Sequence, residues 1–457
     1  MECESRARGN RTVVQSLPIT SERALCDPGT DSLLPEHAKP ARDLPAMSGP
    51  ECRFCGNPLK QTFVDLGMSP LSNSYLRAEQ LSQMEPFYPL HARVCGQCFL
   101  VQLEQFECPE NIFGDYAYFS SYSESWLRHA REYAEAMIER FHLKGKSLIV
   151  EVASNDGYLL QYFQAKGIPV LGVEPAQNVA HAAEQKGIRT LAKFFGVLTA
   201  RELQTSGQLA DLLVANNVLA HVPDLMDFVA GLKLLLKLDG IITVEFPHLL
   251  RLMEGNQFDT IYHEHFSYFS FCTAQNVFAK HGLTVFDVEE VSTHGGSLRL
   301  FACHDAENSR KIHSRVQELR EREIAAGICK LETYSRFGEK VRETKRALLE
   351  LLIGIKRAGK SVVGYGAPAK GNTLLNYCGI GTDFLDYTVD ISPHKQNHFL
   401  PGTHIPIHHP DMIRRTRPDY ILILPWNLRD EVIAQLADIR QWGGRFVIPI
   451  PSAEVIE

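Results

Sequence analysis

The sequence predicts an α/β protein with three structured parts: a small metal-binding module near the N-terminus and two doubly wound α/β domains after it. Three observations lead to this prediction. Two C-x-x-C pairs stand near the start, short apolar runs without polar alternation recur between helical patterns, and a second series of such runs follows a charged helical stretch. Apolar runs of this kind are typical of strands buried on both faces of a parallel sheet.

The composition is that of a multidomain globular protein and disfavours several classes of partner. The chain has 457 residues, 44% of them hydrophobic and 22% charged, and its net charge of −7 opposes binding to nucleic acid or to an anionic membrane. The longest apolar stretch, residues 228–246, contains Lys233, Lys237 and Asp239. We therefore expect no transmembrane segment.

Residues 1–46 are expected to form a disordered extension, because their charges and prolines are scattered without apolar periodicity. One hypothesis is that translation begins at Met47. The extension lacks the apolar core of a secretory signal peptide. We therefore expect a cytoplasmic protein in which the 11 cysteines are reduced. Clustered cysteines then indicate metal binding or catalysis rather than disulfides.

The two cysteine pairs predict a structural zinc site in a module that we place at residues 47–121. Cys52 and Cys55 form one pair, and Cys95 and Cys98 form the other. Four thiolates in two pairs suit tetrahedral Zn²⁺, although the pairs lie further apart than in a compact zinc ribbon, so a small subdomain should fill the gap. Because the protein would occupy all four coordination positions, the metal should anchor the module without taking part in catalysis.

The middle of the chain, residues 122–304, predicts the first doubly wound domain. A helical pattern at 122–141 precedes the apolar run 147–154, which leads into a loop, and a second strand ends at Glu174. An acidic side chain at the tip of the second strand of such a unit accepts hydrogen bonds from ribose hydroxyls. Further strands are expected at 189–195, 210–217 and 240–247, with a helix at about 223–238.

The last two strands of this domain distinguish two candidate folds. Leu283–Val291 and Ser297–Cys303 are joined only by residues 292–296, a link too short for a parallel crossover, so they should form an antiparallel hairpin. A sheet closed in this way is the pattern of S-adenosylmethionine methyltransferases, whereas a nicotinamide-binding domain normally continues parallel and carries G-x-G-x-x-G. The first loop has only Gly157. Loop, hairpin and Glu174 together favour the methyltransferase fold.

A charged helical linker at 305–358 leads to a second doubly wound domain at 359–457. Its first strand, 360–364, is followed by a glycine-rich turn that contains Lys370. Backbone N–H groups at a helix N-terminus, together with a lysine, form an anion site that suits a diphosphate. The turn could alternatively serve tight packing alone. Further strands are expected at 386–390, 420–424 and 445–450.

Together, these motifs resemble those of the sugar C-methyltransferases that modify nucleotide-linked deoxysugars, and the resemblance runs from about Glu51 to the C-terminus. The motifs are Glu151–Gly157, Glu174–Pro175, Asn216–Asp224, Ile261–His265, His294–Arg299, Gly364–Asn372 and Pro425–Asn427. The resemblance implies an α/β fold with a small zinc-binding N-terminal module, a central class I methyltransferase doubly wound sheet ending in an antiparallel hairpin, and a C-terminal Rossmann-like domain. It also implies S-adenosylmethionine as the cofactor and a small-molecule nucleotide-sugar as the substrate.

The resemblance and the positions of the motifs assign two sets of binding residues. The cofactor set is Glu151, Ser154, Asn155, Asp156, Gly157, Glu174, Pro175, Asn216 and Asn217. The substrate set is Tyr116, Tyr118, His294, Gly296, Ser297, Arg299, Tyr365, Ala367, Pro368, Lys370 and Asn372. Tyr116 and Tyr118 would cap the sugar, although core packing explains them equally well. Arg299 would complement a phosphate or the ketone oxygen.

Methylation of carbon requires a carbanion equivalent, which a neighbouring ketone provides when the C–H bond ionises to an enolate. Such a site needs a base and a partner for the oxyanion. The resemblance favours His265 as the base, with Tyr262 and Glu264 in the same site and His221 as a further polar participant. If the segment is extended, His263 and His265 share one face and Tyr262 and Glu264 the other.

Several alternatives stay open at this point. The histidines could be structural, or could bind a catalytic divalent metal, since H-x-H suits such cations. An O- or N-methyltransferase of the same architecture would need no acidic C–H bond. In a nucleotide-sugar-binding protein or an NAD-dependent oxidoreductase, the turn at 364–372 would hold a dinucleotide and Asp390 its ribose. The sequence leaves the identity of the sugar and the oligomeric state open.

Overall fold

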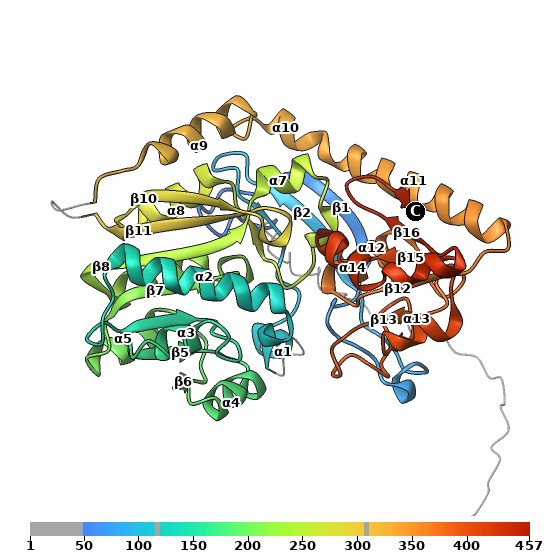
Figure 1. Cartoon of the computed structure of the whole chain (residues 1–457). Helices are drawn as coiled ribbons and strands as arrows, with labels where there is room; N and C mark the ends of the chain where they lie inside the picture. The colour runs from blue at the N-terminus through green and yellow to red at the C-terminus, as the bar shows by residue number, and fades with distance from the viewer. Residues whose placement is uncertain (1–48, 115–118, 306–309) are drawn as a thin grey trace, which may run out of the picture. The chain divides into compact units, whose positions relative to one another are not determined.

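The computed structural model describes residues 49–114, 119–305 and 310–457 (Figure 1). The extension expected to be disordered lies outside these residues, as do Tyr116 and Tyr118. Residues 49–457 form one compact unit. Among its described helices, none is both long enough and apolar enough to span a membrane.

The N-terminal module is built on an antiparallel sheet that takes its last strand from the central domain. β1 (Gln61–Ser69), β2 (Tyr88–Val94) and β3 (Val101–Gln102) lie side by side in this order, and β9 (Ser267–Tyr268) pairs with β3. Since β9 begins just after His265, the sheet of the module ends beside the segment expected to be catalytic. The short helix α1 (Pro109–Phe113) follows the sheet in the chain.

The central domain is a doubly wound sheet with the strand order β10-β11-β8-β7-β4-β5-β6. Its bounds are β4 (Ile149–Val152), β5 (Val170–Val173), β6 (Thr190–Leu191), β7 (Ala210–Asn216), β8 (Leu236–Pro247), β10 (Leu283–Val291) and β11 (Ser297–His304). Strands β4 to β8 are parallel, and β10 and β11 form the antiparallel hairpin that the sequence predicts. The methyltransferase-type sheet is therefore confirmed.

Helices cover this sheet in the alternation expected of a doubly wound fold (Figure 1). They are α2 (Glu124–Phe141), α3 (Leu160–Gln164), α4 (Gln177–Gln185), α5 (Val197–Thr205), α6 (Leu225–Leu235), α7 (Leu249–Glu254) and α8 (Phe271–Lys280). Three short 3-10 helices, η3 (Leu219–His221), η4 (Phe258–Thr260) and η5 (Thr293–Gly295), lie in the loops that carry predicted site residues.

Two predicted elements of the central domain end earlier than expected. The strand predicted at 189–195 is only β6, because the N–H of Lys193 bonds to the carbonyl of Leu191 and turns the chain. The helix predicted to reach about residue 238 ends at Leu235, because Leu236 already pairs with Ala210 and the chain passes directly into β8.

The C-terminal domain contains a second sheet, with the order β14-β13-β12-β15-β16-β17. Its strands are β12 (Val362–Tyr365), β13 (Thr388–Val389), β14 (Ile407–His408), β15 (Tyr420–Ile423), β16 (Arg445–Ile448) and β17 (Glu454–Ile456), of which only β17 is antiparallel to its neighbour. Its helices are α12 (Ala369–Cys378), α13 (Asp411–Thr416) and α14 (Arg429–Gln435). The predicted second parallel domain is therefore present, with β13 shorter than the predicted 386–390.

The predicted helical linker joins the central domain to the C-terminal domain and packs on elements of both. It consists of α9 (Ser314–Ala325), α10 (Leu331–Ser335) and α11 (Phe337–Arg357), shown in orange in Figure 1. Helix α9 contacts α8 and β10, whereas α11 contacts β1 and α12. The ring of Phe63 in β1 stacks on that of Phe337 in α11, with centroids 4.6 Å apart. The N-terminal module thus shares one apolar core with the linker and the C-terminal domain.

Candidate active site

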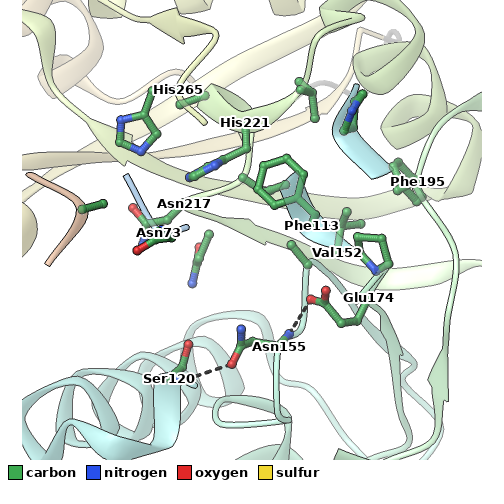
Figure 2. Close-up of a pocket in the computed structure, with 18 of the residues that line it drawn as sticks. Asn73, Phe113, Ser120, Val152, Asn155, Glu174, Phe195, Asn217, His221 and His265 are labelled. Carbon is green, nitrogen blue, oxygen red and sulfur yellow. Dashed lines mark hydrogen bonds between the residues drawn. The ribbon is translucent and has the colours of Figure 1, made fainter. Parts of the chain in front are cut away.

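The carboxyl ends of the central parallel strands open into a cavity of about 540 Å³ (Figure 2). Loops that follow β4, β5, β6 and β7 form part of its wall, together with Thr260, Tyr262, His265 and His294. The C-terminal domain adds its glycine-rich turn, and the N-terminal module adds Asn73. All three parts of the chain therefore contribute to one cavity, at the sheet edge where ligands of doubly wound proteins bind.

Glu174 lies just beyond β5, at the cavity wall, as the sequence predicts. Its carboxylate oxygens accept hydrogen bonds from the backbone N–H groups of Asn155 and Ala176, both at 2.9 Å (Figure 2). The side-chain oxygen of Asn155 accepts another from the N–H of Ser120, also at 2.9 Å. Burial raises the pKa of the Glu174 carboxyl to about 7. The protonated and ionised forms of this side chain are therefore both populated near neutral pH.

Asn216 and Asn217 follow β7 and supply the strongest indication that the cavity takes a polar ligand. The side-chain oxygen and nitrogen of both residues are buried and have no hydrogen-bond partner among the described residues. Both residues line the cavity, as does Pro175. Buried polar atoms nearly always have a partner, so this part of the wall fits a polar ligand of the kind that S-adenosylmethionine represents.

The other predicted cofactor residues support the loop after β4 and do not line the cavity. Asp156 forms an ion pair with Lys186 at 2.9 Å, Ser154 is buried, and burial raises the pKa of the Glu151 carboxyl well above its ordinary value. Gly157 has a φ of 75°, and a Cβ at this position would lie 2.9 Å from the side chain of Ile188. Only glycine fits there, so its role is conformational.

The sequence analysis missed the apolar part of the wall. Phe113, Trp126, Tyr158, Phe194 and Phe195 all line the cavity. The available signal was the position of the Phe194–Phe195 pair, directly after the third parallel strand and therefore at the ligand-binding edge of the sheet. Trp126 also makes an edge contact with His294 at a centroid distance of 5.1 Å, which links helix α2 to the loop before β11.

Residues 262–265 form a turn, and the extended segment considered from the sequence is wrong. The N–H of His265 donates to the carbonyl oxygen of Tyr262 at 2.9 Å, so residues three apart lie on the same side. The rings of Tyr262 and His265 have centroids 4.1 Å apart, and both line the cavity. His263 does not line it, because its Nε2 lies 3.2 Å from the carbonyl oxygen of Pro89 and its ring packs against Tyr88.

The hydrogen bonds of His265 fix its tautomer. Its Nδ1 lies 2.8 Å from the carbonyl oxygen of Thr260, which can only accept, so Nδ1 carries the hydrogen and Nε2 the lone pair. Burial lowers the pKa of His265 to about 4. The ring of His221 lies 4.6 Å away, and burial lowers its pKa well below the ordinary value. Both imidazoles are therefore neutral near pH 7.

Glu264 lies in the same turn but faces the N-terminal module. It is buried, and one carboxylate oxygen accepts a hydrogen bond from Nδ2 of Asn73 at 2.6 Å. Asn73 lines the cavity and Glu264 does not. The sequence offered no signal for this contact, because the two residues lie far apart in the chain and Asn73 belongs to none of the motifs.

The glycine-rich turn of the C-terminal domain brings Pro368 and Lys370 to the cavity. The Lys370 ammonium donates a hydrogen bond to the side-chain oxygen of Asn427 and lies 4.3 Å from the ring centroid of Trp426. Burial lowers the pKa of Lys370 to about 8. Burial also raises the pKa of the Asp259 carboxyl to about 6. Asp259 accepts a hydrogen bond from Trp426 Nε1 at 2.7 Å. A cation thus stands at the turn, as the sequence predicts.

Several residues of the predicted substrate set lie outside the cavity wall. The clearest is Arg299, whose guanidinium is bound by Glu245 at 2.7 Å and by Glu289 at 3.1 Å and does not reach the cavity. Arg299 therefore binds carboxylates from β8 and β10, and not the substrate oxygen that the sequence analysis expects. Gly296, Ser297, Tyr365, Ala367 and Asn372 do not line the cavity either, whereas His294 does.

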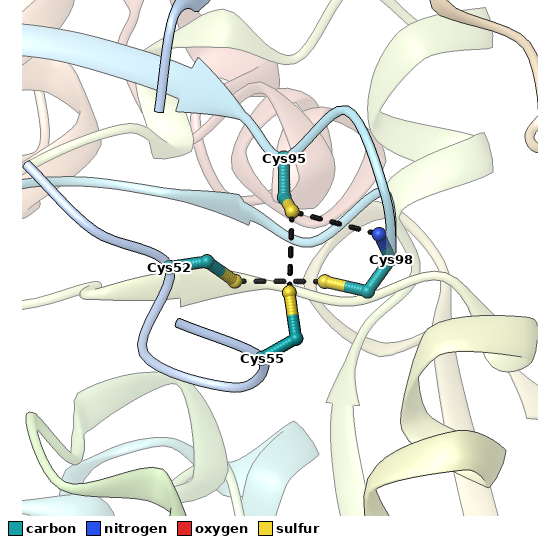
Figure 3. Close-up of side chains that lie close together, drawn as sticks. All are labelled: Cys52, Cys55, Cys95 and Cys98. Atoms are coloured by element: carbon teal, nitrogen blue, oxygen red, sulfur yellow. Dashed lines mark hydrogen bonds between the residues drawn. The ribbon is translucent and has the colours of Figure 1, made fainter. Parts of the chain in front are cut away.

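The four predicted zinc ligands converge in the N-terminal module (Figure 3). Their sulfur atoms all lie within 4.8 Å of one another, with Cys52–Cys98 and Cys55–Cys95 sulfur distances of 3.5 Å. Tetrahedral Zn²⁺ with bonds of about 2.3 Å separates its sulfurs by about 3.8 Å, so the cluster fits the metal. The side-chain nitrogen of Gln102 donates to Cys52 Sγ at 3.2 Å, a contact that stabilises a thiolate.

The fold and the cavity define a class I S-adenosylmethionine-dependent methyltransferase. Family models match in three consecutive parts: "Putative zinc binding domain" at residues 52–113, "Methyltransferase domain" at 126–288 and "C-methyltransferase C-terminal domain" at 292–451. C-methyltransferase NovU of Streptomyces niveus is 37% identical over 406 residues, which cover 89% of this chain and 96% of that protein. The chain belongs to the family of S-adenosylmethionine-dependent C-methyltransferases with an N-terminal zinc-binding module. Membership in this family argues against the two alternative functions, an NAD-dependent oxidoreductase and a nucleotide-sugar-binding protein.

Two solved structures that the chain resembles each match about two fifths of it. A methyltransferase from Clostridium acetobutylicum has a TM-score of 0.32 and 11% identity, covering 39% of this chain and 92% of that one. The magnesium protoporphyrin IX methyltransferase of Synechocystis PCC 6803 with bound SAH has a TM-score of 0.32 and 16% identity, covering 39% and 83%. Likenesses of this size carry no weight for function.

Proposed function

We propose that this enzyme transfers a methyl group from S-adenosylmethionine to the carbon next to the ketone of a nucleotide-linked keto-deoxysugar, by way of an enolate. The main support is the arrangement at His265: a neutral imidazole of fixed tautomer lines the cavity beside Tyr262. Family membership supports carbon as the methylated atom, because the relative is itself named a C-methyltransferase. The keto-sugar is the part of the proposal that goes beyond this membership.

In this proposal, Nε2 of His265 removes the proton from the carbon that will be methylated. Its Nδ1–H bond to Thr260 holds the ring in place and stabilises the imidazolium that forms. Tyr262, whose ring lies beside that of His265, is the candidate donor to the enolate oxygen. His221 is a further polar participant at 4.6 Å. All three side chains line one wall of the cavity.

We propose that Glu174, Asn155, Asn216 and Asn217 hold the cofactor. Glu174 would accept hydrogen bonds from the ribose hydroxyls, as acidic residues at this position of doubly wound folds do. The unpartnered amide atoms of Asn216 and Asn217 would complement other polar groups of the ligand. When bound, S-adenosylmethionine supplies the methyl group.

We expect Glu174→Ala to weaken binding of S-adenosylhomocysteine by about 1.5–3 kcal/mol, or roughly 10- to 150-fold, because hydrogen bonds to a charged partner are lost. Affinity for the sugar nucleotide should change little. Isothermal titration calorimetry with each ligand measures both values. An equal loss for the two ligands would show that Glu174 supports the fold instead.

The raised pKa of Glu174 gives this binding a pH dependence. The ionised carboxylate accepts the ribose hydrogen bonds, so a proton competes with the ligand below the pKa of about 7. Affinity for S-adenosylhomocysteine should fall about tenfold from pH 8 to pH 6. Burial lowers the pKa of His265 and of His294 to about 4, so neither titrates in this window. Glu174→Gln should bind with a flatter pH dependence, and an unchanged slope would assign the titration to another group.

We expect Lys370→Ala to raise the KM for the sugar nucleotide by roughly 10- to 100-fold while kcat changes less. A contact to the diphosphate stabilises the bound substrate and the transition state equally, so its loss raises KM more than it lowers kcat. A hydrogen bond to a charged group contributes about 1.5–3 kcal/mol. Steady-state kinetics at saturating methyl donor measure the change. The matched control is Lys360→Ala, because Lys360 pairs with Asp419 on the surface of the same domain. A loss of kcat alone would remove Lys370 from the diphosphate site.

The proposed function itself is tested by product analysis. The enzyme is incubated with methyl donor and a nucleotide-linked 4-keto-deoxysugar, and the product is examined by mass spectrometry and NMR spectroscopy. We expect one added methyl group bonded to the carbon adjacent to the ketone. A methyl group on oxygen would favour an O-methyltransferase, and no transfer to any keto-sugar nucleotide would refute the substrate class.

A further inference from the structure

The chain between β1 and β2 joins the N-terminal module to the glycine-rich turn of the C-terminal domain. We refer to residues 70–77 as the strap. The backbone of Leu76 pairs with that of Phe399 through two hydrogen bonds of 3.0 and 2.8 Å. The hydroxyl of Tyr75 donates to the carbonyl oxygen of Ala367 at 2.6 Å. The strap is therefore fixed on the C-terminal domain at two points, the glycine-rich turn and Phe399.

Asn73 is the strap residue that lines the cavity, and Figure 2 labels it there. Its amide is oriented by a hydrogen bond to Glu264. Nδ2 donates to a carboxylate oxygen of Glu264 at 2.6 Å, and Oδ1 lies 3.2 Å from the Tyr75 hydroxyl. Since an ionised carboxylate can only accept and the amide nitrogen can only donate, the two groups match in one orientation.

Glu264 depends on this contact because of where it lies. Glu264 is only 3% exposed and belongs to the turn from which Tyr262 and His265 face the cavity. A hydrogen bond donated to a buried carboxylate favours its ionised form and fixes its direction. A shift of Glu264 would move the turn, since the backbone of His265 bonds to that of Tyr262 across it.

We propose that Asn73 is a positioning residue of the active site: its amide holds the Glu264 carboxylate in place and thereby fixes the turn that carries Tyr262 and His265. The zinc-binding module then completes the active site in addition to anchoring the fold. Asn73 acts through Glu264, and the catalytic part of this inference rests on the proposed function.

The first test does not depend on any substrate. Asn73→Asp removes the N–H donor without changing shape and sets a second carboxylate against Glu264. Two facing buried carboxylates do not both ionise readily, so the pKa of at least one must rise. A raised carboxyl pKa in the folded state lowers stability as pH rises through it. We expect the melting temperature of Asn73→Asp to fall relative to wild type between pH 5 and pH 8. That of Asn73→Ala, which removes the donor without adding a second charge, should fall less steeply over the same range.

The second test follows deuterium uptake into the carbon next to the ketone of the sugar nucleotide, in deuterated water with S-adenosylhomocysteine bound. We expect Asn73→Asp to exchange at least tenfold more slowly than wild type at pH 8 and to recover part of the rate at pH 6. Zinc content and affinity for S-adenosylhomocysteine should match wild type. The control is Ser72→Ala, which removes a buried strap hydroxyl that has no partner among the described residues.

Two outcomes would overturn the proposal. One is that Asn73→Asp melts in parallel with wild type over the whole pH range and exchanges at the wild-type rate. The other is that Asn73→Ala loses zinc or affinity for S-adenosylhomocysteine to the same degree as exchange, which would give Asn73 a general structural role. If the wild type shows no exchange, the proposed function fails, and the melting experiment still decides whether Asn73 holds Glu264.

Discussion

His265→Asn is expected to abolish proton exchange at the substrate carbon while leaving ligand binding intact. An enolate mechanism divides into proton removal and methyl transfer, and only the first step needs the base. In deuterated water with S-adenosylhomocysteine in place of the methyl donor, the wild type should exchange the hydrogen on the carbon next to the ketone for deuterium. Loss of a general base lowers the rate by roughly 10²–10⁴-fold.

The asparagine in this variant can still donate a hydrogen bond near the position of Nδ1, so the turn should keep its shape. The matched comparison is His263→Asn, because His263 lies in the same turn but outside the cavity wall. We expect it to exchange much faster than His265→Asn. If His265→Asn exchanges at the wild-type rate, the base lies elsewhere, and His221, with its ring 4.6 Å from that of His265, is the next candidate. Mass spectrometry of the recovered substrate measures both rates.

The parts of the structure that the sequence predicts well depend on local patterns. Apolar runs place strands β4, β5, β7 and β8, and the short link at 292–296 forces the antiparallel hairpin. The C-x-x-C pairs predict the cysteine cluster because ligand spacing within each pair is set by metal geometry. Glu174 could be placed because the tip of a second parallel strand has a fixed relation to the first loop.

The parts that the sequence does not predict depend on tertiary contacts. Alternation along an extended chain groups His263 with His265, but the turn at 262–265 groups His265 with Tyr262 instead. The position of its motif assigns Arg299 to the substrate set, whereas the carboxylates of Glu245 and Glu289 on adjacent strands bind it. Asn73 carries no motif, and only the strap's contacts with the C-terminal domain bring it to the cavity.

The position of the cysteine cluster gives the zinc a consequence beyond the module. Cys52 and Cys95 are buried in the same apolar core as the central sheet, and Gln102 bonds to Cys52 Sγ while its backbone pairs with Ser267 in β9. β9 continues directly from the turn that carries His265. Loss of the metal should therefore release the strand pairing that ends beside His265.

Cys95→Ser is accordingly expected to lose zinc and to lower the melting temperature by roughly 10 °C or more. Structural Zn²⁺ contributes about 10–16 kcal/mol in small zinc modules, comparable to the whole stability of a domain, so its loss cannot be absorbed locally. The control is Cys108→Ser, an exposed thiol outside the cluster, which should keep about one zinc per chain and melt near wild type. Metal analysis and thermal melting measure both variants. If Cys95→Ser melted like wild type, or if wild-type protein held far less than one zinc, the four thiols would not form a structural zinc site. The pairing of β3 with β9 would then stabilise the turn that carries His265 without help from a metal.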